Sequence, residues 1–190
     1  MDVKNTPLKG LQVVELDVFG DSRGFFVERF NAEKFSEFDL PTDFPQINHS
    51  RSAPGVIRGL HFQPTPAQGK MVGCANGRIW DVAVDIRPES PTYGQNFALE
   101  LSDMNGKLLW IPPGFAHGFA VLGDQPADVV YFVTSIYNPK GEQGIAWNDP
   151  SFDVPWPLTD MQLTDGKPVT SQRDDTQQSF VEFKKNPAKW

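Results

Sequence analysis

Alternation of apolar and polar residues is the feature of this sequence that most restricts its fold. In residues 77–87, GRIWDVAVDIR, apolar side chains occupy every second position from Trp80 to Ile86, and Asp81 and Asp85 lie between them. Successive side chains of a β-strand point to opposite faces, so this spacing predicts a strand. The same period of two recurs along much of the chain, which favours an all-β fold.

Turn signals separate these alternating segments. Seventeen prolines and sixteen glycines are spread along the chain, and Asn105-Gly106 is a strong hairpin signal. We expect strands within residues 11–19, 25–30, 46–52, 77–87, 96–102, 107–123 and 127–139. About ten short strands divided by such turns predict a sandwich or jelly-roll barrel.

Short helices are expected only at the periphery of this barrel. Residues 31–41 carry one helical pattern, which ends at a proline, and a second short helix is expected near 176–184. From about residue 150 the chain is rich in Pro, Asp, Thr and Gln, and we expect residues 158–190 to wrap the barrel or form a lid. No repeat or linker divides the chain, which predicts a single domain over 1–190.

Composition excludes several classes of protein. No apolar run is long enough for a transmembrane helix, and the first ten residues lack the apolar core of a signal peptide. One cysteine, Cys74, fits a reducing compartment, so we expect a cytoplasmic protein. A formal charge of −7 argues against nucleic-acid binding through a broad basic surface. A small anionic ligand held by a few arginines remains compatible with that charge.

His61 lies within the predicted strand core RGLHFQ, residues 58–63. It could be a structural histidine, a metal ligand or a catalytic base. A cupin-type metal site needs two or three converging histidines and a carboxylate. The three histidines of this chain, His49, His61 and His117, are scattered, so the sequence predicts no bound metal.

The polar residues near His61 in the sequence favour a functional role for it. Arg58 precedes it by three residues, Lys70 follows it, and Gln46 and Asn48 share one face of the preceding strand. Burying so many polar groups is costly unless they meet one another or a ligand. A bulge at the glycine of RGLH would turn both Arg58 and His61 inward, which is a geometric prediction.

Two tyrosines and a proline-stiffened turn complete the candidates. Tyr131 and Tyr137 would lie on one face of a continuous strand, about 20 Å apart, which is close to the length of a nucleotide-sugar. From spacing alone, ordinary cross-strand packing is the favoured explanation of the two rings. His117, in IPPGFAHGF, is either structural or a phosphate contact, and Arg23 lies at the exit of the turn GDSRGFF.

Five stretches in order resemble the dTDP-4-dehydrorhamnose 3,5-epimerase family of nucleotide-sugar enzymes. They are GDSRGFFVERFN, QINHSRSAPGVIRGLHFQ, GRIWDVAVDIRPESPTYG, LWIPPGFAHGFAVL and YNPKGEQGIAWNDP, within residues 8–157. The resemblance implies a cupin-like jelly roll that uses neither metal nor organic cofactor. It also implies a homodimer in which the N-terminal strands, residues 8–30, pair across the interface.

The resemblance also implies a role for each matching residue. His61 matches the general base, Tyr131 the opposing general acid, Lys70 the cation near the developing oxyanion and Tyr137 the ring that stacks on thymine. The residues that match nucleotide, phosphate or sugar contacts are Arg23, Glu28, Gln46, Asn48, Arg58, His117 and Glu142.

The C-terminal part departs from the family pattern. The family places an aspartate behind its base in a motif like Ser-x-Lys-Asp, soon after Trp-Pro. After Trp156-Pro157, the nearby LTDGKP lacks that spacing, whereas SQRDD supplies Arg173 as the basic residue and Asp174 as the partner of His61. Asp165 is the alternative partner.

The implied reaction inverts C3 and C5 of dTDP-4-dehydro-6-deoxy-D-glucose through an enolate. It needs a base on one face of the sugar, an acid on the other and a positive charge at the ketone oxygen. A mono-epimerase acting on one carbon or a ketoisomerase would share these motifs. A non-catalytic sugar-nucleotide binding module and a metal-dependent cupin oxygenase are the alternatives from other classes.

Overall fold

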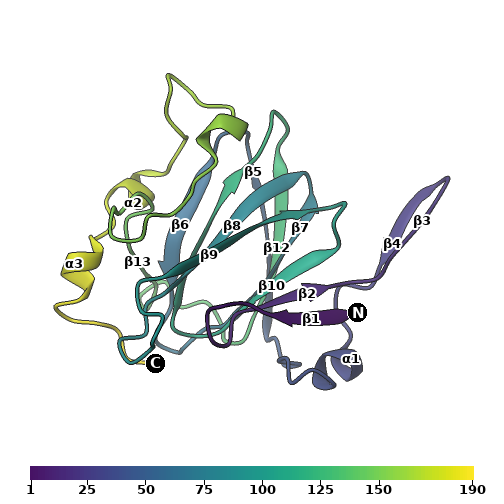
Figure 1. Cartoon of the computed structure of the whole chain (residues 1–190), viewed down its shortest axis with the longest axis horizontal. Helices are drawn as coiled ribbons and strands as arrows, with labels where there is room; N and C mark the ends of the chain where they lie inside the picture. Colours follow the sequence, from purple (N-terminus) through teal and green to yellow (C-terminus); the bar gives the residue numbers. More distant parts are fainter.

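The computed structural model describes all 190 residues, and two antiparallel sheets that face each other form its body (Figure 1). One sheet has six strands in the order β1-β2-β10-β7-β12-β5, and the other has five in the order β13-β6-β11-β8-β9. Apart from β1–β2 and β8–β9, strands that pair within these sheets are not consecutive in sequence, as in a jelly roll. The predicted all-β, cupin-like jelly-roll barrel is therefore confirmed.

The strands of the two sheets are short, and most follow the predicted segments. The six-stranded sheet contains β1 (Asp2–Asn5), β2 (Gln12–Glu15), β10 (Lys107–Ile111), β7 (Lys70–Asn76), β12 (Ala127–Val133) and β5 (Gln46–Ser52). The five-stranded sheet contains β13 (Gln143–Gly144), β6 (Ile57–Phe62), β11 (Phe115–Val121), β8 (Arg78–Asp85) and β9 (Asn96–Ser102).

Three α-helices and one 3-10 turn lie outside the barrel. They are α1 (Ala32–Ser36), η1 (Leu158–Asp160), α2 (Gln172–Asp175) and α3 (Phe180–Phe183). Asn31 caps α1 by accepting hydrogen bonds from two backbone N–H groups of the first turn. The helix expected in residues 31–41 is thus confirmed, and α3 falls within the predicted 176–184. None of these helices has the length and apolar character needed to cross a bilayer.

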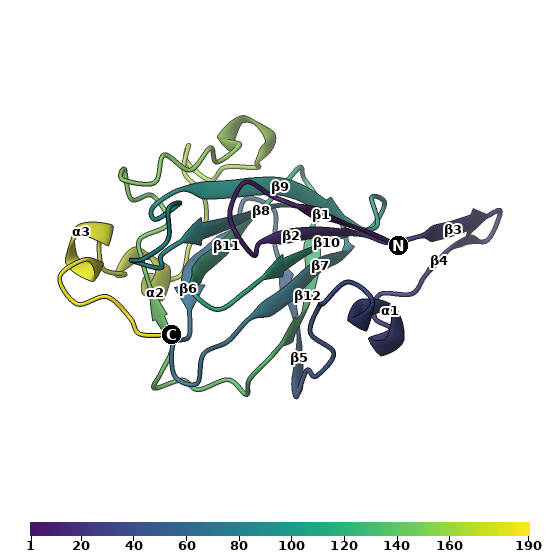
Figure 2. The ribbon, with the colours of Figure 1, turned by 60° about the horizontal axis from the view of Figure 1, so that its bottom comes forward.

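The single strand predicted over residues 11–19 is wrong. The chain leaves the six-stranded sheet after β2, and β3 (Val18–Asp21) pairs only with β4 (Gly24–Val27). This hairpin projects from the body in both views (Figures 1 and 2), and its residues are mostly exposed. Alternation alone could not reveal where the chain leaves the sheet, because both halves of the segment have the same period.

The space between the two sheets is apolar at one end of the barrel. Its largest cluster of buried residues includes Val72, Ile79, Leu109, Phe115 and Val121, all at most 4 % exposed. This cluster supplies much of the hydrophobic stabilisation, because burying one such side chain contributes about 1.5–3 kcal/mol. The other end of the same interior contains polar side chains and is open.

The C-terminal part covers the outer face of the five-stranded sheet. Val82 and Val84 of β8 point away from the barrel interior, yet they are fully buried against Phe152, Phe180 and Phe183. Both faces of β8 are therefore covered. In Figure 1, α2 and α3 lie beside β6 and β13, on the side of the barrel opposite the β3–β4 hairpin.

Candidate active site

A cavity of about 540 Å³ opens at the polar end of the barrel interior. Strands from both sheets supply its walls, so residues far apart in sequence face one another across it. The predicted site residues that line it are Gln46, Asn48, Arg58, His61, Lys70, His117, Tyr131, Tyr137, Glu142 and Arg173. It also includes apolar wall residues, among them Ile47, Phe119 and Val129.

A bulge in β6 turns Arg58 and His61 towards the cavity. His117 of β11 pairs with His61 and Phe119 pairs with Arg58, so two residues of β6 oppose the single Gly118. Gly59, in the bulge, has a φ of +136°, and a Cβ there would lie 2.6 Å from the Gly118 Cα. Glycine is therefore required at this position. The bulge predicted from the sequence is confirmed.

His61 and Asp174 form a close pair at the back of the cavity. His61 Nε2 lies 2.6 Å from Asp174 Oδ1, and Asp174 is only 4 % exposed. Burial by itself raises the pKa of Asp174, but hydrogen bonds from His61 and Ser171 outweigh it and hold the pKa below its ordinary value. Asp174 is therefore ionised at neutral pH. Since Nε2 faces Asp174, Nδ1 is the ring nitrogen left for a substrate.

The short helix α2 brings Asp174 to His61. The Ser171 hydroxyl caps this helix by accepting a hydrogen bond from the Asp174 N–H, and it donates to Asp174 Oδ2 at 2.7 Å. Asp174 Oδ1 is then the oxygen that faces the imidazole. The alternative partner, Asp165, is exposed in the loop before α2 and has a φ of +50°.

A second histidine–carboxylate pair lies beside the first one. His117 Nε2 is 3.0 Å from Asp81 Oδ2 and 3.1 Å from Oδ1, and Asp81 is fully buried. Burial is the main cause that lowers the pKa of His117, although Asp81 opposes it. His117 is therefore a neutral imidazole at pH 7, and its fixed orientation suits hydrogen bonding to a ligand.

Lys70 supplies the buried positive charge of the cavity. Its Nζ lies 3.4 Å from the main-chain oxygen of His61. Burial lowers the pKa of Lys70 to about 8, against the attraction of Glu142 and Asp81. The ammonium is therefore only partly compensated by the protein, and an anionic oxygen in the cavity would stabilise it further.

Tyr131 and Tyr137 both line the cavity, but they do not share a strand. β12 ends at Val133, so the prediction of one continuous strand that contains both tyrosines is wrong. Tyr131 pairs with Asn48 of β5. Burial raises the pKa of Tyr131, so its phenol keeps its proton at neutral pH and can donate it.

Tyr137, Glu142 and Arg173 form a polar cluster at the cavity wall. Tyr137 Oη donates a hydrogen bond to Glu142 Oε2 at 2.8 Å, and Arg173 Nη2 lies 2.5 Å from the same oxygen. Burial raises the pKa of Glu142, but the hydrogen bonds from Tyr137 and Arg173 outweigh it and lower the pKa overall. This carboxylate therefore links the loop after β12 to helix α2.

Arg23 and Glu28 are the two predicted contact residues that lie outside the cavity. Arg23 pairs with Asp21 at the tip of the projecting β3–β4 hairpin, and Glu28 pairs with Lys34 of α1 at 2.8 Å. Within one chain they do not reach His61 or Lys70. The structure therefore brings the remaining predicted site residues together and leaves these two apart.

Sequence reasoning missed several residues of this site. Asp81 had a visible signal, because a carboxylate on the inward face of an otherwise apolar strand needs a partner. Ser171 also had one, since a serine three residues before Asp174 has the spacing of a helix cap. No three His, Cys, Asp or Glu side chains converge in a geometry suited to a metal ion. The arrangement instead offers an imidazole, a phenol and an ammonium around one enclosed space, which suits proton transfer.

Comparison with known proteins gives consistent matches over nearly the whole chain. The family model described as dTDP-4-dehydrorhamnose 3,5-epimerase matches residues 5–182. The dTDP-4-dehydrorhamnose 3,5-epimerase of Shigella flexneri is 45% identical over 184 residues, which cover 96% of this chain and 97% of that protein.

Solved structures of two enzymes superpose closely on this chain. The Legionella pneumophila epimerase, in complex with dTDP-4-keto-L-rhamnose, gives a TM-score of 0.86 at 41% identity, over 94% of this chain and 92% of that one. ChmJ, a 3'-monoepimerase from Streptomyces bikiniensis in complex with dTDP-quinovose, gives 0.84 at 28% identity, over 95% of this chain and 88% of that one.

Proposed function

This chain belongs to the dTDP-4-dehydrorhamnose 3,5-epimerase family and is an isomerase of that type, and we propose that the cavity around His61 carries out its reaction. The substrate is dTDP-4-dehydro-6-deoxy-D-glucose, and the product is dTDP-4-dehydro-L-rhamnose. The single observation that carries the assignment of roles is that His61, Lys70 and Tyr131 line the same cavity.

His61 removes the proton from the carbon beside the ketone. That proton is acidic because its loss leaves an enolate, in which the electron pair of the C–H bond moves to the ketone oxygen. Nδ1 of His61 accepts the proton, and the Asp174 carboxylate at Nε2 fixes the tautomer and stabilises the imidazolium that forms. Histidine is the side chain most often used as a general base at neutral pH.

Lys70 and Tyr131 complete the inversion. The Lys70 ammonium stabilises the negative charge on the enolate oxygen. The Tyr131 hydroxyl then gives its proton to the opposite face of the same carbon. The configuration is inverted because the proton leaves on one face and returns on the other. Each inversion leaves His61 with one more proton and Tyr131 with one fewer, and exchange with solvent restores both.

The outer part of the cavity suits the nucleoside diphosphate. Arg58 and Arg173 are the cations that would bind the diphosphate, where a planar guanidinium can make two parallel hydrogen bonds. Tyr137 is 41 % exposed and offers a ring face on which thymine can stack. His117, Gln46, Asn48 and Glu142 are the remaining contact residues of the proposal.

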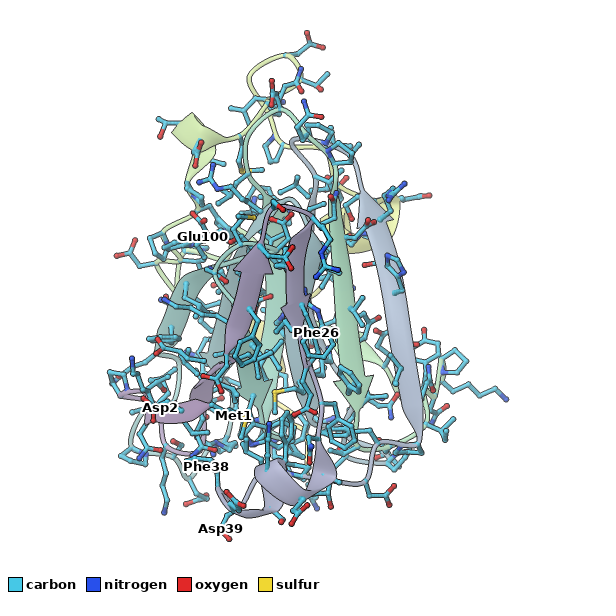
Figure 3. All side chains as sticks on the ribbon, turned by 90° about the vertical axis from the view of Figure 1, so that its right-hand side faces the viewer. Met1, Asp2, Phe26, Phe38, Asp39 and Glu100 are labelled. Carbon is cyan, nitrogen blue, oxygen red and sulfur yellow. The ribbon has the colours of Figure 1, made fainter.

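We also infer that the protein is a homodimer in which the β3–β4 hairpin brings Arg23 and Glu28 to the partner's cavity. Phe19 and Phe26 on that hairpin are 64 % and 66 % exposed, an unusual exposure for phenylalanine (Figure 3, where Phe26 is labelled). β5 is also an edge strand, and an edge strand can pair with a strand of another chain.

Mixing two inactive variants would test this arrangement. Arg23→Ala and His61→Ala would each be inactive alone, and a mixture would recover activity if the residues act across the interface. No recovery after exchange of subunits, or a monomer in light scattering, would contradict the homodimer. We further propose that the enzyme works in the cytoplasm, which its single buried free cysteine suits.

Incorporation of solvent deuterium into dTDP-4-keto-6-deoxyglucose tests the proposed chemistry. In D₂O, the purified enzyme is expected to place deuterium at both C3 and C5, and NMR of the product identifies the inverted centres. Exchange at one carbon only would indicate a mono-epimerase, and migration of the ketone would indicate a ketoisomerase. Binding of dTDP without any exchange would indicate a non-catalytic binding module.

A further inference from the structure

Gln63 lies two residues beyond His61, at the end of β6, and the proposed reaction gives it no role. Its side chain is buried, with 2 % of the residue exposed. The amide nitrogen donates to the main-chain oxygens of Pro66 at 2.9 Å and Ile136 at 3.2 Å, and it lies 3.4 Å from the Ser135 hydroxyl. The amide oxygen accepts a hydrogen bond from the Asn138 N–H at 2.7 Å. Both ends of the amide therefore hold neighbouring segments.

Two of these contacts flank Tyr137. Gln63 binds the carbonyl of the residue before Tyr137 and the N–H of the residue after it. The N–H of Tyr137 itself donates to Gln46 Oε1 at 2.9 Å. Two glutamine side chains thus fix the main chain on both sides of residue 137. The backbone determines the direction of the Cα–Cβ bond. These hydrogen bonds from Gln63 and Gln46, the backbone clamp, therefore also fix the position of the Tyr137 Cβ, to which the ring is attached.

Packing alone does not hold the Tyr137 ring in place. The residue is 41 % exposed and follows the end of β12 at Val133, so it lacks the support of a sheet ladder. The side-chain contact to Glu142 engages only the hydroxyl, at the far end of the ring. Binding of a planar ligand to an exposed ring is tighter when the loop and side chain are already ordered, because less conformational entropy is then lost on binding. The backbone clamp supplies that restraint.

We propose that Gln63 is a positioning residue that sets the place of the nucleobase-stacking ring relative to the catalytic base. This inference rests on the proposed function, because it takes Tyr137 as the ring that stacks on thymine. Gln63 and His61 belong to the same short segment, and Gln63 binds directly to the backbone around Tyr137. The Gln63 side chain therefore fixes how far the ring of Tyr137, which would bind the nucleobase, lies from His61, which would bind the sugar.

Substitution Gln63→Met tests this role, because methionine is unbranched and similar in size but makes no such hydrogen bonds. The Kd for dTDP, measured by calorimetry, is expected to rise about 2- to 10-fold, the cost of ordering one side chain on binding. The Kd for inorganic pyrophosphate, a probe without a base, should stay unchanged. KM should rise in parallel with the Kd for dTDP, while kcat for deuterium exchange stays near the wild-type value.

Gln68→Met is the matched control. Gln68 also binds the loop after β12, since its amide donates to the Ser135 oxygen at 2.8 Å, but it does not touch the peptide groups on either side of Tyr137. Its substitution should leave the Kd for dTDP unchanged. An equal rise in both variants would overturn the specific role of Gln63, because general loosening of the loop would then explain it.

A double-mutant cycle with Tyr137→Ala separates positioning from general stability. Tyr137→Ala should raise the Kd for dTDP by about 5- to 100-fold, the usual worth of one stacked base. Gln63→Met should add nothing further in the Tyr137→Ala protein, and additive effects would overturn the inference. If Tyr137→Ala leaves the Kd unchanged, the stacking role of Tyr137 is wrong, and the inference falls with it.

A second variant covers the case in which Gln63→Met does not fold. Gln63→Glu keeps the length of the side chain and the acceptor for the Asn138 N–H, but it loses both donors to main-chain oxygens. It should raise the Kd for dTDP and leave the Kd for pyrophosphate unchanged. A wild-type Kd for dTDP in this variant would overturn the proposal.

Discussion

The two ends of the barrel interior are built on the same strands but have opposite properties. On β7, Lys70 lies in the open cavity, whereas Val72 and Cys74 point the same way and are fully buried in the apolar cluster. On β12, Tyr131 and Val129 both line the cavity, and Val129 also belongs to the apolar cluster. A step of two residues along a strand therefore separates a chemical group from a core residue.

The difference between the two ends shows how one fold can remain stable although its functional site lowers the free energy of unfolding. The apolar end gains free energy for every side chain that it buries. The open end contains a lysine whose pKa is lowered to about 8, so its charge is held at the expense of stability. We expect substitutions at the two ends to act on different properties of the protein, and three predictions test that separation.

The largest effect is expected at the open end. His61→Gln should reduce the rate of solvent deuterium exchange by about 10²–10⁴-fold, because an amide cannot act as a base. The melting temperature should change little, since the glutamine amide nitrogen can take the place of His61 Nε2 and donate a hydrogen bond to Asp174. NMR of the exchange reaction and a thermal melt are the measurements. An active variant, or one that loses activity only because it unfolds, would break the comparison.

A core substitution at the apolar end should have the converse effect. Leu109 is fully buried between the sheets, so Leu109→Ala should lower the free energy of unfolding by about 2–5 kcal/mol. The Kd for dTDP and the exchange rate, measured at a temperature where the variant is folded, should match the wild type. Denaturant unfolding checks the first outcome. A large loss of activity in folded protein would show that the two ends are coupled.

The smallest effect concerns the cost of the buried lysine. Because burial lowers the pKa of Lys70 from 10.5 to about 8, the folded protein binds this proton less tightly than the unfolded chain. Lys70→Met should therefore raise the free energy of unfolding at pH 7 by roughly 1–3 kcal/mol, while exchange activity is lost. The cost to the wild type is complete below pH 8, and it disappears as the pH rises towards 10.5.

Thermal melts of both proteins between pH 7 and 10.5 measure this third prediction. The gain in stability of Lys70→Met should shrink steadily across that range. Two results would show that Lys70 does not lower the stability of the fold. One is a variant less stable than the wild type at pH 7, and the other is a gain in stability that grows as the pH rises.

Much of the fold could be predicted because alternation is local. The alternation of β8 follows directly from its sequence, but which face points inward does not, because Val82 and Val84 lie against the C-terminal part and not in the barrel. The glycine of RGLH was enough to predict the bulge that turns Arg58 and His61 inward. The departure of β3 from the sheet could not be predicted in this way. It depends on which strand lies beside β2, and the alternating pattern contains no information about neighbours.

The site residues borne by strands were easier to find than those borne by connections. Tyr131 lies on a predicted strand, along which the positions of one face can be counted. The alternation predicts no strand over β7, so Lys70 could not be placed by counting. Tyr137 lies beyond the end of β12, so counting along a strand could not place its ring. The partnership of Gln63 with the backbone around Tyr137 joins residues more than seventy positions apart, and no local pattern encodes such a contact.

The contact between Gly59 and Gly118 has a consequence for how this site can change over evolution. A Cβ on Gly59 would meet the Gly118 Cα at 2.6 Å, and a Cβ on Gly118 would meet the Arg58 oxygen at 2.6 Å. A side chain at either glycine would clash with the backbone of the other strand, so no single substitution at Gly59 or Gly118 is tolerated. The bulge that sets the spacing of Arg58 and His61 therefore cannot change by single substitutions at these glycines. We expect changes of substrate specificity to arise instead at other residues that line the cavity.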